Sequence, residues 1–222
     1  DMRGLVRVGA AVPSLALGNV KENMKRHLAM MREAKEKHVS IVTFPELSLT
    51  GYTCGDLFFQ RRLLDDVTDA LLTLKDEMPE GILAVVGAPL EIEGALYNCA
   101  VVLHKGEIIS AVPKTFLPNN GEFYEKRWFQ SGDARRDASV AIPKLKTDVC
   151  RQAIFETEDG VRFGIELCED LWAPLPPSTM LSVEGAEIIL NLSASNELLS
   201  KREYRQQLIS QQSARCQCGY VY

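Results

Sequence analysis

The sequence predicts an α/β protein built on a mixed β-sheet. Apolar segments at residues 5–12 and 40–44 are separated by a helical pattern, at the spacing of a βαβ unit, so these two strands should be parallel. Farther along, apolar segments at residues 97–104 and 107–112 flank Lys105-Gly106, which is typical of a tight hairpin turn. A hairpin makes its strands antiparallel, so the sheet contains both kinds of pair.

Two helices of the N-terminal half are indicated by apolar periodicity. The first begins at Asn19, which forms a capping-box pattern with Glu22. Its apolar residues fall on one face: Val20, Met24, Leu28 and Met31. The second carries Leu64, Val67, Leu71, Leu74 and Met78. It leads into an apolar strand at residues 82–88, which we expect to be buried on both faces. The polar residues 131–148 indicate a surface loop.

The C-terminal half centres on a strand that ends at a cysteine. Residues 161–168 alternate between apolar and polar side chains, and the proline-rich segment 172–177 then stops the strand. Cys168 therefore lies where a strand ends and a turn begins. Ser178 is placed to cap a short helix, and residues 186–192 form a further strand.

Composition excludes several classes of protein. The 222 residues carry a net charge of −5, which argues against a nucleic-acid partner. No apolar run approaches the roughly 20 residues of a membrane helix, and the N-terminus does not resemble a signal peptide. We therefore expect no membrane association.

The cysteines point to a reducing compartment rather than to a disulfide scaffold. Six cysteines in a chain of this length are too few for such a scaffold, so we expect a cytoplasmic protein. Cys216 and Cys218 lack a second cysteine or histidine pair, and we expect no metal site.

Three strand ends carry residues suited to chemistry. Glu46 and Lys114 each follow a predicted strand, as Cys168 does, and ligands collect at such carboxyl ends in open α/β sheets. A cysteine nucleophile needs a base, a role that a carboxylate can fill. The alternative is that Cys168 is a small buried hydrophobe, with its pKa raised by the flanking acids.

The local sequences around these three residues resemble the signature blocks of the nitrilase, or carbon–nitrogen hydrolase, superfamily. The blocks are Phe44-Pro45-Glu46, Pro113-Lys114 and Glu166-Leu167-Cys168-Glu169, in the order of that superfamily. The resemblance covers nearly the whole chain. It implies an αββα sandwich, in which two mixed sheets pack face to face with helices outside.

Within the superfamily, the sequence is most similar to the glutaminase domains of glutamine-dependent NAD synthetases. The segments that carry this likeness are Leu49-Thr50-Gly51-Tyr52, Gly55-Asp56-Leu57-Phe58, Leu117-Pro118-Asn119, Glu122-Phe123-Tyr124-Glu125, Cys168-Glu169-Asp170-Leu171-Trp172 and Asn191-Leu192-Ser193-Ala194-Ser195. The resemblance implies hydrolysis of L-glutamine through a thioester, with the ammonia used to amidate deamido-NAD to NAD.

The resemblance also implies a role for each site residue. Cys168 would be the nucleophile, Glu46 the general base and Lys114 an oxyanion-stabilising cation, supported by Glu125 as a second carboxylate. The substrate-binding residues would be Tyr52, Asn120, Glu169, Ser195 and Lys201. Asn120 replaces a tyrosine that is frequent at its position, which bears on substrate specificity rather than on the chemistry.

We expect residues 1–222 to form one carbon–nitrogen hydrolase (glutaminase) domain that is truncated at its C-terminus. The phosphate-loop sequence of an ATP-dependent synthetase domain does not occur in the chain. ATP and magnesium would serve only that synthetase domain, which would belong to the same polypeptide, and a homo-oligomer is expected. The alternatives are a stand-alone amidase acting on another amide or carbamoyl substrate, and a catalytically silent assembly module. A silent module would have no need of all three predicted catalytic residues.

Overall fold

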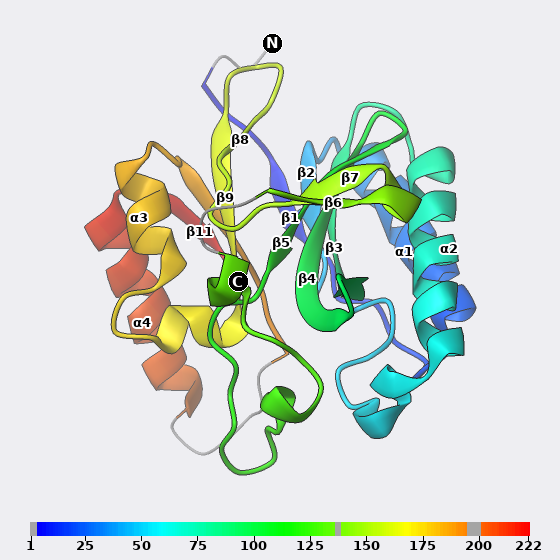
Figure 1. Cartoon of the computed structure of the whole chain (residues 1–222). Coiled ribbons are helices and arrows are strands. Elements are labelled where there is room, and N and C mark those ends of the chain that lie inside the picture. Colours follow the sequence, from blue (N-terminus) through cyan, green and yellow to red (C-terminus); the bar gives the residue numbers. More distant parts are fainter. Residues whose placement is uncertain (1–3, 136–138, 195–200) are drawn as a thin grey trace.

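The chain folds into four layers, arranged helix, sheet, sheet, helix (Figure 1). The structure, a computed structural model, describes residues 4–135, 139–194 and 201–222. Helices α1 and α2 cover the outer face of the larger sheet, while α3 and α4 lie against the smaller one. The αββα sandwich with two mixed sheets, implied by the resemblance, is confirmed.

The larger sheet has seven strands in the order β1-β2-β3-β4-β5-β7-β6. Their bounds are Val8–Ala10, Ile41–Thr43, Leu83–Ile92, Ala95–His104, Glu107–Pro113, Thr147–Val149 and Val140–Ile142, in that order across the sheet. β1 and β2 are parallel, as the βαβ pattern predicts. β4 and β5 form the expected antiparallel hairpin, with positive φ at both Lys105 and Gly106.

The smaller sheet has four strands in the order β11-β10-β9-β8. Their bounds are Gly219–Val221, Ile188–Leu192, Arg162–Leu167 and Phe155–Glu156. β9 is parallel to β10, which is parallel to β11, whereas β8 is antiparallel to β9. The central strand β9 is buried on both faces beyond Arg162, because the large sheet covers one face and α3 the other.

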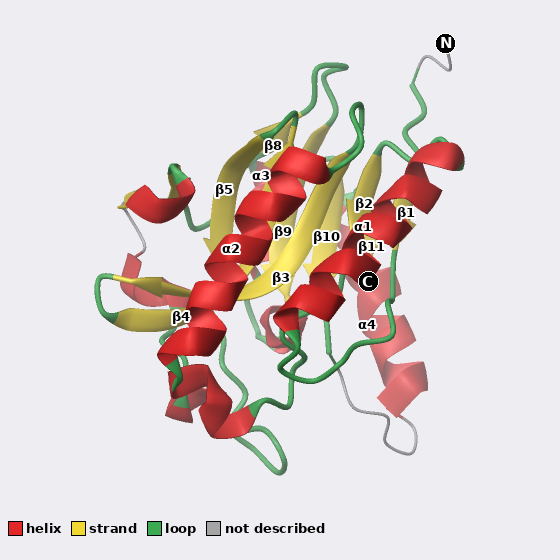
Figure 2. Cartoon of the chain, turned by 90° about the vertical axis from the view of Figure 1, so that its right-hand side faces the viewer, coloured by secondary structure: helices red, strands yellow, loops and turns green. Residues whose placement is uncertain are grey.

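The helices are α1 (Val20–Glu36), α2 (Arg61–Glu77), α3 (Pro177–Val183) and α4 (Lys201–Cys216). Figure 2 looks onto α1 and α2, which lie across the large sheet. The side chain of Asn19 caps α1 by accepting a hydrogen bond from the N–H of Glu22, as the capping pattern predicts. The predicted apolar residues of both helices are buried, except for Met24, which is partly buried against the core.

The space between the two sheets is filled by apolar side chains from both. The larger sheet contributes Ile41, Leu83, Val85, Ala100, Val102 and Val112, and the smaller sheet contributes Phe155, Phe163, Ile165, Leu167, Leu190 and Leu192. The alternation predicted for residues 161–168 therefore points Phe163, Ile165 and Leu167 into this layer. Burial of this layer holds the strand ends of the two sheets next to each other.

Two sequence-based expectations are corrected by the structure. Residues 131–148 do not form only a surface loop, because β6 and β7 extend the large sheet beside β5. The apolar residues of these two short strands alternate over only three positions among polar neighbours, which is too short a pattern to predict a strand. The strands form because β7 pairs with the edge of β5 and β6 pairs with β7. Ser178 is also not the cap of α3, because that position is held by Pro176. The N–H of Ser178 instead donates to the buried carboxylate of Glu166.

None of the helices in the described part of the chain is both long enough and apolar enough to cross a membrane.

The loop after β2 crosses β3 at Gly87. The N–H of Leu49 donates to the Gly87 carbonyl oxygen at 3.0 Å, and the N–H of Gly87 donates to Ser48 Oγ at 3.2 Å. Nδ1 of His27 lies 2.6 Å from the carbonyl oxygen of Asn23, which can only accept, so this nitrogen carries the proton. Nε2 of His27 then accepts from the hydroxyl of Ser48, 2.8 Å away. Helix α1 and Gly87 together fix the loop that carries Glu46.

We predict that Gly87→Ala destabilises the protein by about 1–3 kcal/mol or more, because overpacking forces backbone to move. A Cβ at this position would lie 2.3 Å from the Leu47 nitrogen and 2.4 Å from the Pro45 carbonyl oxygen. Urea unfolding measures the effect. The matched control is Gly219→Ala, whose Cβ would have its nearest neighbour at 3.7 Å. Equal stability of the two variants would contradict the close approach at Gly87.

Candidate active site

Three strand ends place Glu46, Lys114 and Cys168 at one edge of the sandwich. Glu46 follows β2, which is parallel to β3, and Lys114 follows β5. Because β5 is antiparallel to β4 and β4 is antiparallel to β3, β2 and β5 run in the same direction. Cys168 follows β9 in the other sheet. The three strand ends therefore converge, as the sequence predicts.

Lys114 is the centre of a buried charge cluster. Its Nζ lies 2.5 Å from Glu46 Oε2 and 2.7 Å from Glu125 Oε1. All three residues are about 1% exposed. The hydroxyl of Tyr52 donates to Glu125 Oε1 at 2.6 Å, and Asn98 Nδ2 donates to Glu46 Oε2 at 3.0 Å. The cluster thus includes the predicted residues Tyr52 and Glu125 and adds Asn98.

The two oxygens of Glu46 have different surroundings. Oε2 accepts from both Lys114 and Asn98, whereas Oε1 is buried and has no hydrogen-bond partner among the residues that the structure describes. A buried polar atom without a partner is costly and calls for an explanation. One oxygen of Glu46 is therefore anchored, and the other can exchange a proton with a bound reactant.

Burial and charge act in opposite directions on the pKa values of this cluster. Burial raises the pKa of Glu46 to about 7, although the ammonium group of Lys114 favours the charged carboxylate. Burial opposes the charge of Lys114, but the carboxylates of Glu46 and Glu125 outweigh it and raise the pKa of Lys114. Lys114 is therefore a permanent cation, while Glu46 titrates near neutrality.

Cys168 has a left-handed backbone conformation at the start of a 3₁₀ turn, Cys168–Trp172, with φ of +37°. A non-glycine residue in this region is strained and needs support from its surroundings. Its N–H donates to Asn191 Oδ1 at 3.0 Å, and Asn191 Nδ2 donates to the hydroxyl of Tyr220 at 2.9 Å. That hydroxyl in turn donates to Glu166 Oε1. A chain of hydrogen bonds from β9, β10 and β11 therefore holds the cysteine turn.

The acids next to Cys168 in the sequence are not the main influence on its thiol. Burial and, after it, the charge of Glu46 raise the pKa of Cys168 to about 11, against the opposing charge of Lys114 and hydrogen bonds from Ser193 and the backbone of Ala194. Glu166 faces Ser178 and Tyr220. The charge that opposes a thiolate therefore comes from Glu46, which is distant in sequence.

Asp170 joins the cysteine turn to the segment that follows Lys114. Its Oδ1 accepts from the N–H groups of Thr115 and Phe116, and its Oδ2 accepts from the N–H of Leu167. Burial raises the pKa of Asp170 to about 7, although these N–H groups favour the charged form. The two strand ends are thus held together by one buried carboxyl group.

The other predicted substrate-binding residues differ in where the structure places them. Glu169 is half-buried; burial raises its pKa, and the charges of Lys114 and Lys201 oppose that rise. Lys201 begins α4, and its Nζ lies 5.4 Å from the ring centre of Trp172 and 5.8 Å from that of Phe123. Asn120 lies on an exposed turn rather than in the cluster, and Ser195 lies outside the described residues.

Sequence reasoning assigned no role at the site to Asn98, Asp170, Asn191, Ser193 or Tyr220. A usable signal existed for Asn98, an amide within an apolar strand, because buried polar groups require partners. Asn191 lies near the end of β10 and Ser193 directly follows that strand, so the alternation of an extended chain points both side chains the same way. The neighbour of these side chains could be recognised only once the order of the strands was known.

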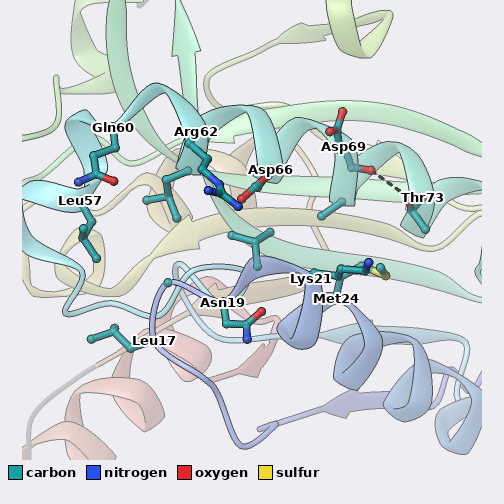
Figure 3. A pocket seen from close by; sticks show the side chains of 14 residues that line it. Leu17, Asn19, Lys21, Met24, Leu57, Gln60, Arg62, Asp66, Asp69 and Thr73 are labelled. Atoms are coloured by element: carbon teal, nitrogen blue, oxygen red, sulfur yellow. Dashed lines mark hydrogen bonds between the residues drawn. The ribbon is translucent and has the colours of Figure 1, made fainter.

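A separate groove lies on the outer surface between α1 and α2 (Figure 3). It has a volume of about 680 Å³ and is lined from α1 by Lys21 and Met24 and from α2 by Arg62 and Asp66, among others. None of the predicted catalytic residues lines it.

In the described part of the chain, no group of three or more histidine, cysteine, aspartate or glutamate side chains is arranged to hold a metal ion.

We predict that Tyr220→Phe lowers the free energy of unfolding by about 1–3 kcal/mol, because Glu166 and Asn191 each lose a hydrogen-bond partner. Urea denaturation provides the measurement. Tyr204→Phe, which removes a hydroxyl from an exposed tyrosine, should stay within about 0.5 kcal/mol of the wild type. A loss no larger than that of this control would show that the hydroxyl of Tyr220 does not support the turn.

Comparisons with known proteins place this geometry in a family. Residues 7–222 match the carbon-nitrogen hydrolase family profile. The chain is 37% identical to a glutamine-dependent NAD(+) synthetase of Mycobacterium tuberculosis, over 99% of this chain and 32% of that protein. A relative of the same name from Rattus norvegicus is 30% identical over 85% of this chain and 27% of its own length. The chain thus spans about a third of the length of these curated relatives.

Solved structures of related proteins have the same fold. A glutamine-dependent NAD(+) synthetase from Cytophaga hutchinsonii superposes with a TM-score of 0.85 at 29% identity, covering 97% of this chain and 35% of its own. An amidase from Nesterenkonia sp. has a TM-score of 0.77 at 16% identity, covering 97% of this chain and 75% of its own, a likeness of fold alone. With a family profile that matches almost its whole length, this chain belongs to the carbon-nitrogen hydrolase family.

Proposed function

We propose that this chain is a glutaminase domain, which hydrolyses the side-chain amide of L-glutamine and releases ammonia. The observation that carries the proposal is the arrangement at the carboxyl edge. A cysteine in a strained turn lies within the electrostatic influence of a buried carboxylate and a buried ammonium group. That combination supplies the nucleophile, the base and the oxyanion stabiliser of an acyl-transfer reaction.

The first half of the proposed reaction forms a thioester. Glu46 removes the proton of the Cys168 thiol, and Sγ attacks the amide carbon, so that an S–C bond forms and the carbonyl oxygen becomes negative. The ammonium group of Lys114, with the backbone N–H of Glu169, stabilises this oxyanion. The C–N bond then breaks, and the leaving nitrogen takes the proton from Glu46 and departs as ammonia.

The second half releases glutamate. Water gives a proton to Glu46 and attacks the thioester carbon, the S–C bond breaks, and the thiolate recovers the proton from Glu46. The pKa of about 7 for Glu46 suits both duties, because a base and an acid in turn work best when the pKa lies near the working pH. The unpartnered Oε1 is the oxygen that we assign to proton transfer.

Substrate recognition would use the residues around the mouth of the site. We propose that Glu169 pairs with the α-amino group of glutamine and that Lys201 pairs with its α-carboxylate. Trp172 and Phe123 lie beside the Lys201 ammonium group, which supports a fixed position for that charge. Tyr52 would line the pocket, and Ser195 and Asn120 stay predictions from the resemblance.

The names of the relatives support a proposal for the use of the released ammonia. The matched proteins are named glutamine-dependent NAD(+) synthetases, so we propose that the ammonia amidates deamido-NAD in a synthetase domain of the same polypeptide. We propose that ATP and magnesium serve that domain, whereas the steps above use groups of this chain, the substrate and water. A cytoplasmic location and a homo-oligomeric assembly are further parts of this proposal.

We expect Cys168→Ala to lower the release of ammonia from L-glutamine by more than about a thousandfold, because the nucleophile is removed. The wild type should also gain one adduct on Cys168 from a glutamine-mimicking electrophile, detected by intact mass. The matched control is Cys150→Ala, which removes a half-buried thiol directly after β7 and should leave turnover unchanged.

The same assay separates the alternatives. Turnover of other amides with none of L-glutamine would favour the stand-alone amidase. Neither an adduct nor turnover with any amide would favour the silent assembly module.

A further inference from the structure

The hydroxyl of Ser193 contacts the sulfur atom of Cys168. Ser193 Oγ lies 3.4 Å from Cys168 Sγ, a normal hydrogen-bond distance to sulfur, and 2.8 Å from the hydroxyl oxygen of Tyr222. β9, β10 and β11 lie side by side in the small sheet (Figure 2), so these contacts join three neighbouring strands. The pairing of β9 with β10 ends at Leu167 and Leu192, and Cys168 and Ser193 are the residues that directly follow this last pair.

Asn191 at the end of β10 and the residues directly after that strand, Ser193 and Ala194, all contact Cys168. Asn191 accepts from the backbone N–H of Cys168, and Ser193, which directly follows β10, contacts the Cys168 side chain. The first contact fixes the turn, and the second reaches the reacting atom itself.

We propose that Ser193 is a further catalytic residue, which donates its hydroxyl proton in a hydrogen bond to the Cys168 thiolate and stabilises it during attack and expulsion. The proposal rests on the function proposed above. Ser193 keeps its proton throughout, so no bond to it forms or breaks. Its site of action is distinct from the oxyanion, which Lys114 stabilises.

The direction of the hydrogen bonds follows from chemistry. A thiolate has no proton to donate, so the single hydroxyl proton of Ser193 must point to Sγ when the thiolate is present. The hydroxyl of Tyr222 then donates to Ser193 Oγ and orients it. A donor is needed because the thiol is buried and faces the carboxylate of Glu46, both of which raise the pKa of Cys168.

The test is the rate at which iodoacetamide alkylates Cys168 in the full chain, followed by mass spectrometry across neutral and mildly alkaline pH. Below its pKa the thiol reacts in proportion to its thiolate fraction. Because a hydrogen bond to a charged group is lost, Ser193→Ala should slow alkylation roughly ten- to a hundredfold. That slowing would reflect a higher pKa of Cys168 in the variant.

Matched variants distinguish this role from a structural one. Ser193→Thr, which keeps the hydroxyl, should recover most of the rate, and Tyr222→Phe should give a smaller loss than Ser193→Ala. Ser182→Ala, which removes a hydroxyl within α3, should alkylate as the wild type does. Unchanged alkylation of Ser193→Ala would overturn the proposal, as would a loss that Ser193→Thr fails to recover.

The readout does not depend on glutamine. Failure of the proposed function would appear as absent ammonia release from a protein whose Cys168 still alkylates in a Ser193-dependent manner. Failure of the Ser193 proposal would instead leave alkylation unchanged while glutamine is still turned over.

Discussion

The buried ammonium group of Lys114 is the interaction on which the site depends. Two carboxylates from separate segments, Glu46 after β2 and Glu125 in the 3₁₀ turn Glu125–Arg127, meet at this one cation. None of these charges could be buried alone, since an isolated ion in the interior costs far more than a paired one. Burial of each of these three charged groups is therefore tolerable only when the other two are buried beside it.

The same cluster controls the chemistry of the neighbouring cysteine. Burial makes the Cys168 thiol hard to ionise, with a pKa of about 11, so attack requires a base close by. In the proposed reaction Glu46 is that base, and its geometry supports the role: one of its oxygens is anchored by Lys114 and Asn98, while the other has no partner among the described residues. Backbone strain at Cys168 is borne by hydrogen bonds from β10 and β11. The proposed nucleophile and its proposed base are thus supported from opposite sheets.

The sequence predicted the parts of the site that depend on local order. Glu46, Lys114 and Cys168 could be found because apolar strands end abruptly before each of them, and the resemblance added Glu125 and Tyr52. Asn191, Ser193 and Tyr220 could not, because their partners depend on the order of strands in the small sheet. The same reason explains residues 131–148, whose strand β7 exists through pairing with β5, more than thirty residues earlier in the chain.

The most direct test of the account compares the stability of two charge variants. Lys114→Met should lose about 3–5 kcal/mol of unfolding free energy, because it leaves two buried carboxylates without their cation. The triple variant Lys114→Met/Glu46→Gln/Glu125→Gln should recover most of that loss, since no buried charge then remains in the cluster. Urea denaturation of both variants at neutral pH measures the difference. A triple variant no more stable than Lys114→Met would contradict the claim that these three residues are held as one electrostatic unit.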